Sequence, residues 1–475
     1  MKREEYLRMI NVGALLSNTS NFLYTYILIA LLIFAGLYFT VRTRGVQFRL
    51  FPEALRVLGE KKKDGKDISS FQALMISTAS RVGTGNIAGV ANAIIAATVI
   101  GGYGAVFWMW LLALIGAASA FIESTLAQCY KEKHGDNWVG GPAYYIQKAL
   151  GSRFFGVVFA VLLIACFAYG FNALQAYNAG SALQYYLPGY SESVWPAVVG
   201  AALALLTGLC IFGGVRRISA ITSGIVPVMA AIYIALGLFI TVKNIGQVPY
   251  MLSMIVSQAF DPKAMFAGIG ASCIMQGIKR GLYSNEAGMG SAAIPAASAA
   301  TDSPARQGYV NMTGVFFDTT VICTVTGLCI CASGVLGTAD ASGGQVNGVA
   351  LTALAFKTVL GPLGGLLVSL GIVLFAFSTI LGWEFCGETA FAFLFGRRAI
   401  PLYRILFALA AFLGATQSLE VVWNLSDIFN ALMAVPNLIS LLLLSGTAAR
   451  ELEAFHPEIR LRRRLRQSRA VRRAL

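Results

Sequence analysis

Two stretches of the sequence, far apart in the chain, repeat one pattern of glycines and polar residues. Residues 81–93 align without a gap on residues 280–292, with Arg, Asn, Ala, Gly and Ala shared at the first, sixth, eighth, ninth and thirteenth positions. Each copy lies inside an apolar segment, where glycines and polar side chains are normally scarce. Interrupted helices at matching places in two halves of a membrane protein point to a transporter's binding site. The pattern therefore predicts a ligand site built on two broken helices.

The first copy offers groups for two kinds of ligand. Gly83, Gly85 and Gly89, with Thr84 and Asn86 between them, favour local unwinding of a membrane helix. Unwinding frees backbone carbonyl oxygens for a cation, and it leaves a helix N-terminus whose N–H groups favour a carboxylate. Tight packing of small residues between helices is the alternative explanation. The presence of a second copy favours unwinding.

A further apolar region, residues 155–187, carries the amides of Asn172, Gln175 and Asn178. An amide in the middle of a membrane helix can bind a small zwitterion or an adjacent unwound backbone. An ordinary hydrogen bond between helices is an equally good explanation.

Two neighbouring hydroxyls, those of Ser378 and Thr379, lie in a long apolar region near the C-terminal end. Hydroxyl oxygens facing a broken helix are hard ligands suited to a small alkali cation, although back-bonding to the preceding turn is the alternative. Trp383 follows one turn after Thr379 on the same helix face, where it would close a pocket around a small side chain.

Charged residues within the apolar regions are costly and point to function by default. Arg81, Lys279, Arg280 and Glu286 belong to this group, and snorkelling, gate pairing and ligand contact all remain open for them. A proton relay would need an intramembrane carboxylate, and the spacing selects none of the candidates, which are Glu123, Asp318, Glu384 and Glu388.

Catalysis finds no support in the sequence, which has no apparent phosphate-binding loop, metal cluster or nucleophile–base arrangement. The eight cysteines form neither a disulfide framework nor a zinc spacing. Only two histidines, His134 and His456, are present, which excludes a histidine-rich metal site. We therefore expect no enzyme and no cofactor.

The composition is that of a membrane protein. Hydrophobic residues make up 57% and charged residues 12%, with a mean hydropathy of +0.70, whereas soluble domains carry roughly 25% charged residues. One span needs about 20 apolar residues. Eleven helical regions can be drawn, and those at 264–298 and 350–395 are too long for a single unbroken span. The others lie at 21–40, 71–98, 104–130, 155–187, 194–213, 218–242, 308–334, 399–419 and 421–447.

These regions divide into one accessory helix and two sets of five. Because five is odd, the second set must start from the opposite face, so the repeat is inverted. The expected parts are an accessory N-terminal helix (1–42), a cytoplasmic basic loop (43–70), inverted repeat 1 (71–242), inverted repeat 2 (248–447) and a basic cytoplasmic tail (448–475).

Charge predicts the orientation. Of the 36 Lys and Arg residues, 27 fall in loops and a tail that lie on one side if eleven spans alternate. The positive-inside rule makes this side cytoplasmic, with the N-terminus outside and the C-terminus inside. Contact with anionic lipid headgroups explains the basic tail better than binding of a nucleic acid does.

Four motifs, in order, resemble the alanine or glycine:cation symporter family, and the resemblance extends over residues 15–448. This family belongs to the amino acid–polyamine–organocation superfamily, whose leucine-transporter fold has inverted repeats and midplane sites. The motifs are Thr84–Val90, Gly141–Ile146, Ser284–Ala292 and Ser378–Trp383.

The resemblance implies sodium-driven uptake of alanine and glycine across the inner membrane by alternating access, with Na⁺ as the coupling ion and no prosthetic group. It places a sodium site at the backbone near Ala79 and Val82 with Ser378 and Thr379. It implies an amino-acid site lined by Thr84, Gly85, Asn86, Gln175, Ile380 and Trp383. A proton-coupled symporter, a channel and a membrane-embedded enzyme are the rival hypotheses.

Overall fold

The protein is described by a computed structural model over residues 3–59, 68–97, 102–135, 137–184, 186–187, 189–265, 272–339, 345–417 and 419–474. The lysine-rich centre of the predicted basic loop, residues 60–67, lies outside these ranges. So do the arginine side chains of the tail beyond residue 455.

Helices dominate this structure, and eight of those in the described residues are long and apolar enough to cross a membrane. All eleven predicted regions contain helix, which confirms the all-α membrane class, while the count of eleven spans stays a prediction. The accessory segment consists of α1 (Arg3–Phe22), a π-helical turn η1 (Leu23–Leu28) and α2 (Ile29–Arg42).

The predicted first repeat begins with a broken helix. A capping box starts α5, because Ser69 Oγ accepts from the backbone N–H of Gln72 at 3.1 Å while the Gln72 side chain accepts from Ser69 N at 3.0 Å. The elements are α5 (Ser70–Arg81), η2 (Thr84–Asn86), α6 (Ala88–Ala96), α7 (Gly104–Cys129), α9 (Arg153–Ile164), η3 (Ala165–Phe171), α10 (Asn172–Gln184), α11 (Trp195–Ile211) and α12 (Gly214–Lys243).

The predicted second repeat also begins with a broken helix. Its elements are α16 (Cys273–Asn285), α17 (Ala293–Ser298), α18 (Pro304–Val315), η6 (Phe316–Cys323), α19 (Thr324–Ala332), α20 (Gly348–Phe395), α21 (Ile400–Ala415) and α22 (Leu419–Ala474). As expected for region 350–395, α20 is interrupted: Gly361 has φ 73° and Pro362 follows it. Proline lacks the N–H that a continuous helix needs, so the chain bends there.

Short elements connect the long helices. One of them, a two-stranded antiparallel hairpin that pairs Lys133 with Trp138, was not anticipated from the sequence. They are α3 (Val46–Arg49), α4 (Phe51–Leu58), β1 (Glu132–His134), β2 (Asn137–Val139), α8 (Pro142–Ala149), η4 (Tyr190–Glu192), η5 (Ile245–Gln247), α13 (Val248–Ala259), α14 (Pro262–Met265) and η7 (Arg397–Ala399).

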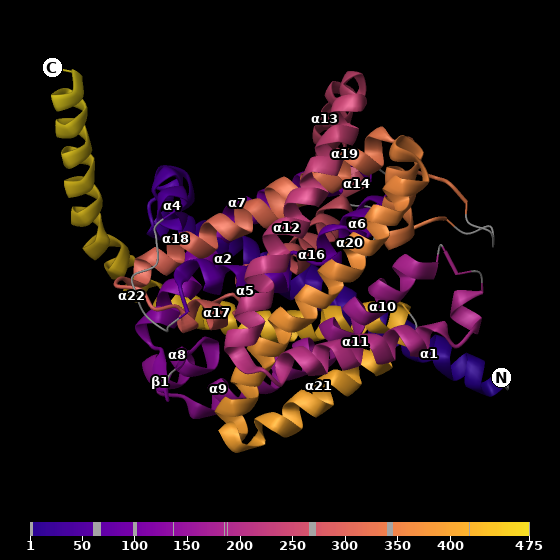
Figure 1. Ribbon diagram of the computed structural model, residues 1–475, viewed down its shortest axis with the longest axis horizontal. Helices are drawn as coiled ribbons and strands as arrows, with labels where there is room; N and C mark the ends of the chain where they lie inside the picture. The colour runs from indigo at the N-terminus through magenta and orange to yellow at the C-terminus, as the bar shows by residue number, and fades with distance from the viewer. Residues whose placement is uncertain are drawn as a thin grey trace.

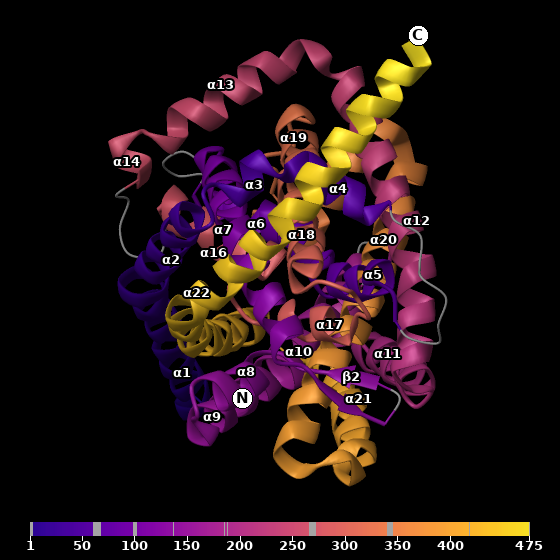
Figure 2. The ribbon, with the colours of Figure 1, turned by 90° about the vertical axis from the view of Figure 1, so that its left-hand side faces the viewer.

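The two chain ends lie on opposite sides of the molecule, and the last part of α22 projects away from the bundle as a helix (Figure 1). The predicted tail therefore continues α22. In Figure 2, α13 and α14 lie along the outside of the bundle.

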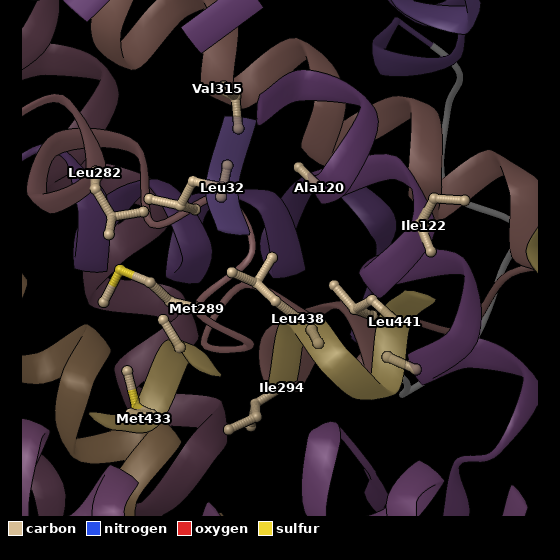
Figure 3. Packing of buried hydrophobic residues seen from close by; sticks show 14 of the residues in the cluster. Leu32, Ala120, Ile122, Leu282, Met289, Ile294, Val315, Met433, Leu438 and Leu441 are labelled. Carbon is tan, nitrogen blue, oxygen red and sulfur yellow. The ribbon is translucent and has the colours of Figure 1, made fainter. Parts of the chain in front are cut away.

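The largest hydrophobic cluster joins the accessory helix to the core. Leu32 of α2 and Leu438 of α22 pack with Leu282 and Met289, which flank the second helix break (Figure 3). This packing fixes the broken segment between α7 and α22, so the break is held by close-packed side chains on both sides.

Candidate functional site

The first helix break separates α5 from α6. Helix α5 ends at Arg81, and Val82 (φ −86°, ψ 83°) and Gly83 (φ −133°, ψ −156°) leave the helical conformation. One tight turn later the chain enters α6 at Ala88. The predicted unwinding of this segment is therefore present.

Close approach by other helices explains two glycines of this break. A Cβ on Gly83 would overlap the hydroxyl of Thr379 and would lie 2.9 Å from Nε2 of Gln175. A Cβ on Gly85 would lie 2.5 Å from two ring carbons of Tyr283. Neither glycine has a positive φ, so the missing side chain, and not backbone freedom, is what the site needs here.

The second break, between α16 and α17, has a different construction. Glu286 (φ 52°), Gly288 (φ 85°) and Gly290 (φ 92°) all adopt left-handed backbone conformations. Glycine adopts such angles without strain, whereas for Glu286 they cost roughly 1–2 kcal/mol. Interactions of the Glu286 side chain must offset this cost.

Those interactions are three hydrogen bonds. The fully buried Glu286 carboxylate accepts from Trp383 Nε1 at 2.7 Å, from Ser291 Oγ at 2.5 Å and from Ser80 Oγ at 3.3 Å. The sequence left the role of Glu286 open. The structure makes it a buried acceptor that ties the second break to α5 and α20.

Asn86 joins the two broken helices. Its Nδ2 donates to Ser284 Oγ at 2.9 Å and to the backbone oxygen of Asp318 at 2.8 Å, while its Oδ1 accepts from Gly83 N at 3.2 Å. Both hydrogens of the amide nitrogen are used by these bonds. Asn86 thus lies at the predicted site, where its side chain fastens the first break to α16 and η6.

The amide helix α10 lies against the first break, as predicted. Gln175 Oε1 accepts from the backbone N–H of Thr84 at 3.3 Å, and Gln175 Nε2 donates to the Tyr283 hydroxyl at 3.3 Å. Asn178 Nδ2 donates to Thr84 Oγ1 at 2.8 Å. Helix α10 directly follows the π-helical turn η3, a local irregularity that is frequent at functional sites.

Aromatic rings surround this polar segment. Trp383 is 1% exposed, and its ring centroid lies 4.8 Å from that of Phe171 and 6.2 Å from that of Tyr283. Phe171 and Tyr283 meet edge to face at 4.7 Å. The three rings, from η3, α16 and α20, pack against one another, and the ring of Tyr283 lies directly beside Gly85.

The predicted cation ligands are partly assembled. Thr379 Oγ1 lies 3.4 Å from the backbone oxygen of Val82, to which it donates. Ser378 Oγ donates to Phe375 O at 3.0 Å, the back-bonding alternative that the sequence left open. Gly382 lets α20 approach the backbone of α5, because a Cβ there would lie 2.6 Å from Ser80 N. Ala79, the remaining predicted ligand, is buried in the adjacent turn of α5.

Ile380 is placed differently from its neighbours. Its side chain is buried in a cluster with Tyr403 and Phe407 of α21. Any contribution of Ile380 to the site therefore comes from its backbone.

The cationic residues at the start of both motif copies, and Lys279 directly before the second, form ion pairs inside the protein. Arg81 Nε lies 2.9 Å from Oδ2 of Asp318, with both side chains buried. Asp427 of α22 receives two cations, Lys279 at 2.6 Å and Arg280 at 3.3 Å. These pairs resolve the open roles of Arg81, Lys279 and Arg280 in favour of contacts between helices.

A model of the sodium:alanine symporter family matches residues 9–468. The sodium/alanine symporter AgcS of Methanococcus maripaludis is 42% identical over 94% of this chain and 98% of its own length. The chain belongs to the sodium:alanine symporter family. The amino-acid carrier protein AlsT of Bacillus subtilis is also 42% identical, over 92% of this chain and 90% of its own length.

The fold of this symporter is shared with a solved transporter structure. MhsT, crystallised with L-phenylalanine, superimposes with a TM-score of 0.60 over 83% of this chain and 93% of its own, at 16% identity. The expectation of a leucine-transporter-like fold is thereby confirmed. The family consists of transporters, so this chain is a multi-pass membrane protein for amino-acid symport.

Sequence reasoning did not anticipate Tyr283 and Phe171 as parts of the candidate site. Tyr283 lies inside the quoted second motif copy, but nothing in that copy indicates that its ring would face Gly85. Asn178 was recognised only as one of three amides, and its bond to Thr84 follows from its place three residues after Gln175. Helical spacing of these amides was the one available signal.

Proposed function

We propose that the protein imports alanine and glycine together with Na⁺ by alternating access. One observation carries this proposal: two backbone groups of the first break, only two residues apart, contact different candidate ligand groups. The carbonyl oxygen of Val82 faces the Thr379 hydroxyl, and the N–H of Thr84 faces the Gln175 amide. A cation and an amino acid would bind the same short unwound segment.

Sharing this segment gives a physical basis for coupling. Each ligand orders backbone that the other also needs, so each lowers the ordering cost for the other. The mutual effect on binding free energy must be equal in both directions. Backbone carbonyls with the hydroxyls of Ser378 and Thr379 provide oxygen ligands that suit a small monovalent cation and need no carboxylate.

The proposed amino-acid site explains a preference for small side chains. Trp383, Phe171 and Tyr283 pack closely together beside Gly85, so a substrate side chain bound there would contact aromatic rings. The N-terminal end of α6 favours the substrate carboxylate. We assign the lining to Thr84, Gly85, Asn86, Gln175, Trp383 and the backbone of Ile380, and the sodium site to Ala79, Val82, Ser378 and Thr379.

We place the protein in the inner membrane with the N-terminus outside and the C-terminus in the cytoplasm. The charge asymmetry of the loops supports this orientation, as do chain ends on opposite sides of the molecule (Figure 1). The basic tail would then lie near anionic headgroups.

Uptake of labelled alanine into proteoliposomes, with and without a sodium gradient, tests the function. We expect saturable uptake that requires sodium and that glycine inhibits. If uptake depends on a pH gradient and not on sodium, the coupling ion is H⁺ and not Na⁺. Uptake that does not saturate with alanine concentration would indicate a channel. Thr358→Val, a change at an exposed back-bonded threonine of α20, is the control variant.

A further inference from the structure

A pocket opens beside the last turns of α20, away from the two helix breaks. The hairpin supplies Trp138, α8 supplies Tyr144, and α20 supplies Phe385, Glu388 and Thr389. These segments belong to loops and helix ends that charge places on the cytoplasmic side. Arg397, which donates to the backbone oxygen of His134 at 3.2 Å, holds the hairpin over the pocket.

The pocket lies on the helix face that also carries the proposed sodium ligand Ser378. Residues spaced by three and four along a helix share one face, and the series from Ser378 through Gly382 and Phe385 to Thr389 follows this spacing. Ser378 lies about 15 Å from Glu388 along the axis, at 1.5 Å per residue. Phe385, 5% exposed, stands between the two.

The charges beside this pocket do not balance. Arg404 Nε lies 2.7 Å from Oε2 of Glu388 and 3.7 Å from Oε1 of Glu384, one turn earlier on α20. Among the described residues, no other cation comes within 4.0 Å of either carboxylate. Glu384 is fully buried, and neither of its oxygens accepts a hydrogen bond from the described residues. Two carboxylates thus share one guanidinium.

An uncompensated carboxylate away from water is costly and calls for a proton or a metal cation. The other ionisable groups that face the pair are Tyr403 on α21, together with Arg397 and His134 at the pocket rim. Tyr403 supplies no positive charge, and Arg397 and His134 lie at the exposed end. Glu388 lines the pocket, and Glu384 is buried one turn nearer to Ser378 along α20, so the excess negative charge lies at the buried side of the pocket.

We propose that Glu384 and Glu388 form a second, transient site for a monovalent cation, on the exit route from the Ser378–Thr379 site to the cytoplasm. Phe385 is the barrier between the two sites. The inference rests on the proposed sodium-coupled symport. Na⁺ and H⁺ are the two candidate cations for this site, and the experiment below distinguishes them.

The test measures sodium dependence separately from each side, in right-side-out and inside-out vesicles that contain the full-length protein. We expect Glu388→Gln to raise the cytoplasmic sodium KM about tenfold, the effect of one lost charged ligand, and to leave the outer sodium KM within about twofold. If the cation is a proton, Glu388→Gln abolishes the dependence of transport on cytoplasmic pH and leaves both sodium KM values unchanged. Equal shifts on both sides, or no change in sodium or pH dependence, would overturn the proposal.

A second measurement does not depend on transport. Thr389→Cys, placed in a background without the partly exposed Cys129 and Cys210, is labelled from the cytoplasmic side with a membrane-impermeant thiol reagent. Sodium at constant pH should slow the labelling, and Glu388→Gln should remove that protection. Protons lower the thiolate fraction of any cysteine, so a protonated site would be indicated by slowing beyond that seen at the same pH in Glu388→Gln. Labelling that neither cation affects contradicts the transient site even if Glu388→Gln impairs folding. Absence of sodium-driven uptake in the wild type would instead refute the proposed function.

Discussion

The two motif copies align residue by residue, yet their glycines serve different purposes. In the first copy, Gly83 and Gly85 have ordinary φ angles and are needed because Thr379, Gln175 and Tyr283 press against them. In the second copy, Gly288 and Gly290 supply left-handed backbone. The same sequence pattern therefore builds one break that other helices contact closely and one that folds back on itself.

The shared polar residues also diverge. Asn86 fastens the first break to α16 and η6, whereas Asn285 Oδ1 accepts from the N–H of Ala287, two residues away, at 3.0 Å, and from no other donor in the described part of the chain. Arg81 pairs with Asp318, and Arg280 pairs with Asp427. From this comparison we propose that the first break faces the ligands and that the second acts as a scaffold, a division that mutations can test.

The largest effect should come from Gly85→Ala in the first break. The added Cβ would overlap the Tyr283 ring, and overpacking of this kind costs about 1–3 kcal/mol. We expect sodium-dependent alanine uptake to fall by about 100-fold, since 1.36 kcal/mol corresponds to a factor of ten. Gly371→Ala on α20, where a Cβ meets no atom within 4 Å, is the matched control. Wild-type uptake by Gly85→Ala would contradict a ligand-facing first break.

In the second break, Glu286→Ala should impair the scaffold. The indole N–H of Trp383 and two serine hydroxyls would lose their acceptor, at about 1–3 kcal/mol for a buried donor left without a partner. We expect a clearly lower melting temperature of the purified protein and about 30-fold slower uptake. Glu286→Gln keeps one acceptor oxygen and should fall between Glu286→Ala and wild type. Equal melting temperatures for all three would show that Glu286 does not hold the break.

Gln175→Ala sharpens the comparison, because it removes a partner of the first break and leaves the second intact. It deletes the acceptor for Thr84 N and the donor to Tyr283. The alanine KM should rise about tenfold, because losing one net hydrogen bond costs roughly 1–2 kcal/mol of binding free energy. The melting temperature should move less than in Glu286→Ala. A loss of stability with an unchanged KM would place Gln175 in the scaffold instead.

The smallest effects should come from removing the adjacent hydroxyls of Thr379 and Ser378 one at a time. Thr379→Val removes the hydroxyl that meets Val82 O, whereas Ser378→Ala removes one already bonded to its own helix. We expect the sodium KM to rise about fivefold in Thr379→Val and by less than about twofold in Ser378→Ala. The reverse order, measured in sodium titrations of alanine uptake, would make Ser378 the main ligand.

Sequence patterns predicted the elements better than their contacts. The apolar runs, the glycine-rich breaks and the positions of Gln175 and Thr379 could all be anticipated, because helical periodicity defines which residues share a face. The same periodicity cannot say which helices meet. It therefore missed Tyr283 opposite Gly85, the fastening role of Asn86 and the packing of Ile380 against α21.

The hairpin escaped prediction for a related reason. Its strands are three residues long, and its register is held partly by Arg397, which lies more than 250 residues away. Local propensity carries little information at that length.

Gly382 has a mechanical consequence. Where α20 meets α5, the backbone of Gly382 lies against that of Ser80, so no side chain of residue 382 stands between the two helices. Individual dispersion contacts at such a backbone contact are weak. Two hydrogen bonds hold this end of α5: Thr379 Oγ1 of α20 donates to the backbone oxygen of Val82 at 3.4 Å, and Ser80 Oγ donates to Glu286 at 3.3 Å. Movement of α5 away from α20 would therefore break the Thr379–Val82 hydrogen bond, whereas movement away from η6 would break the buried ion pair between Arg81 and Asp318.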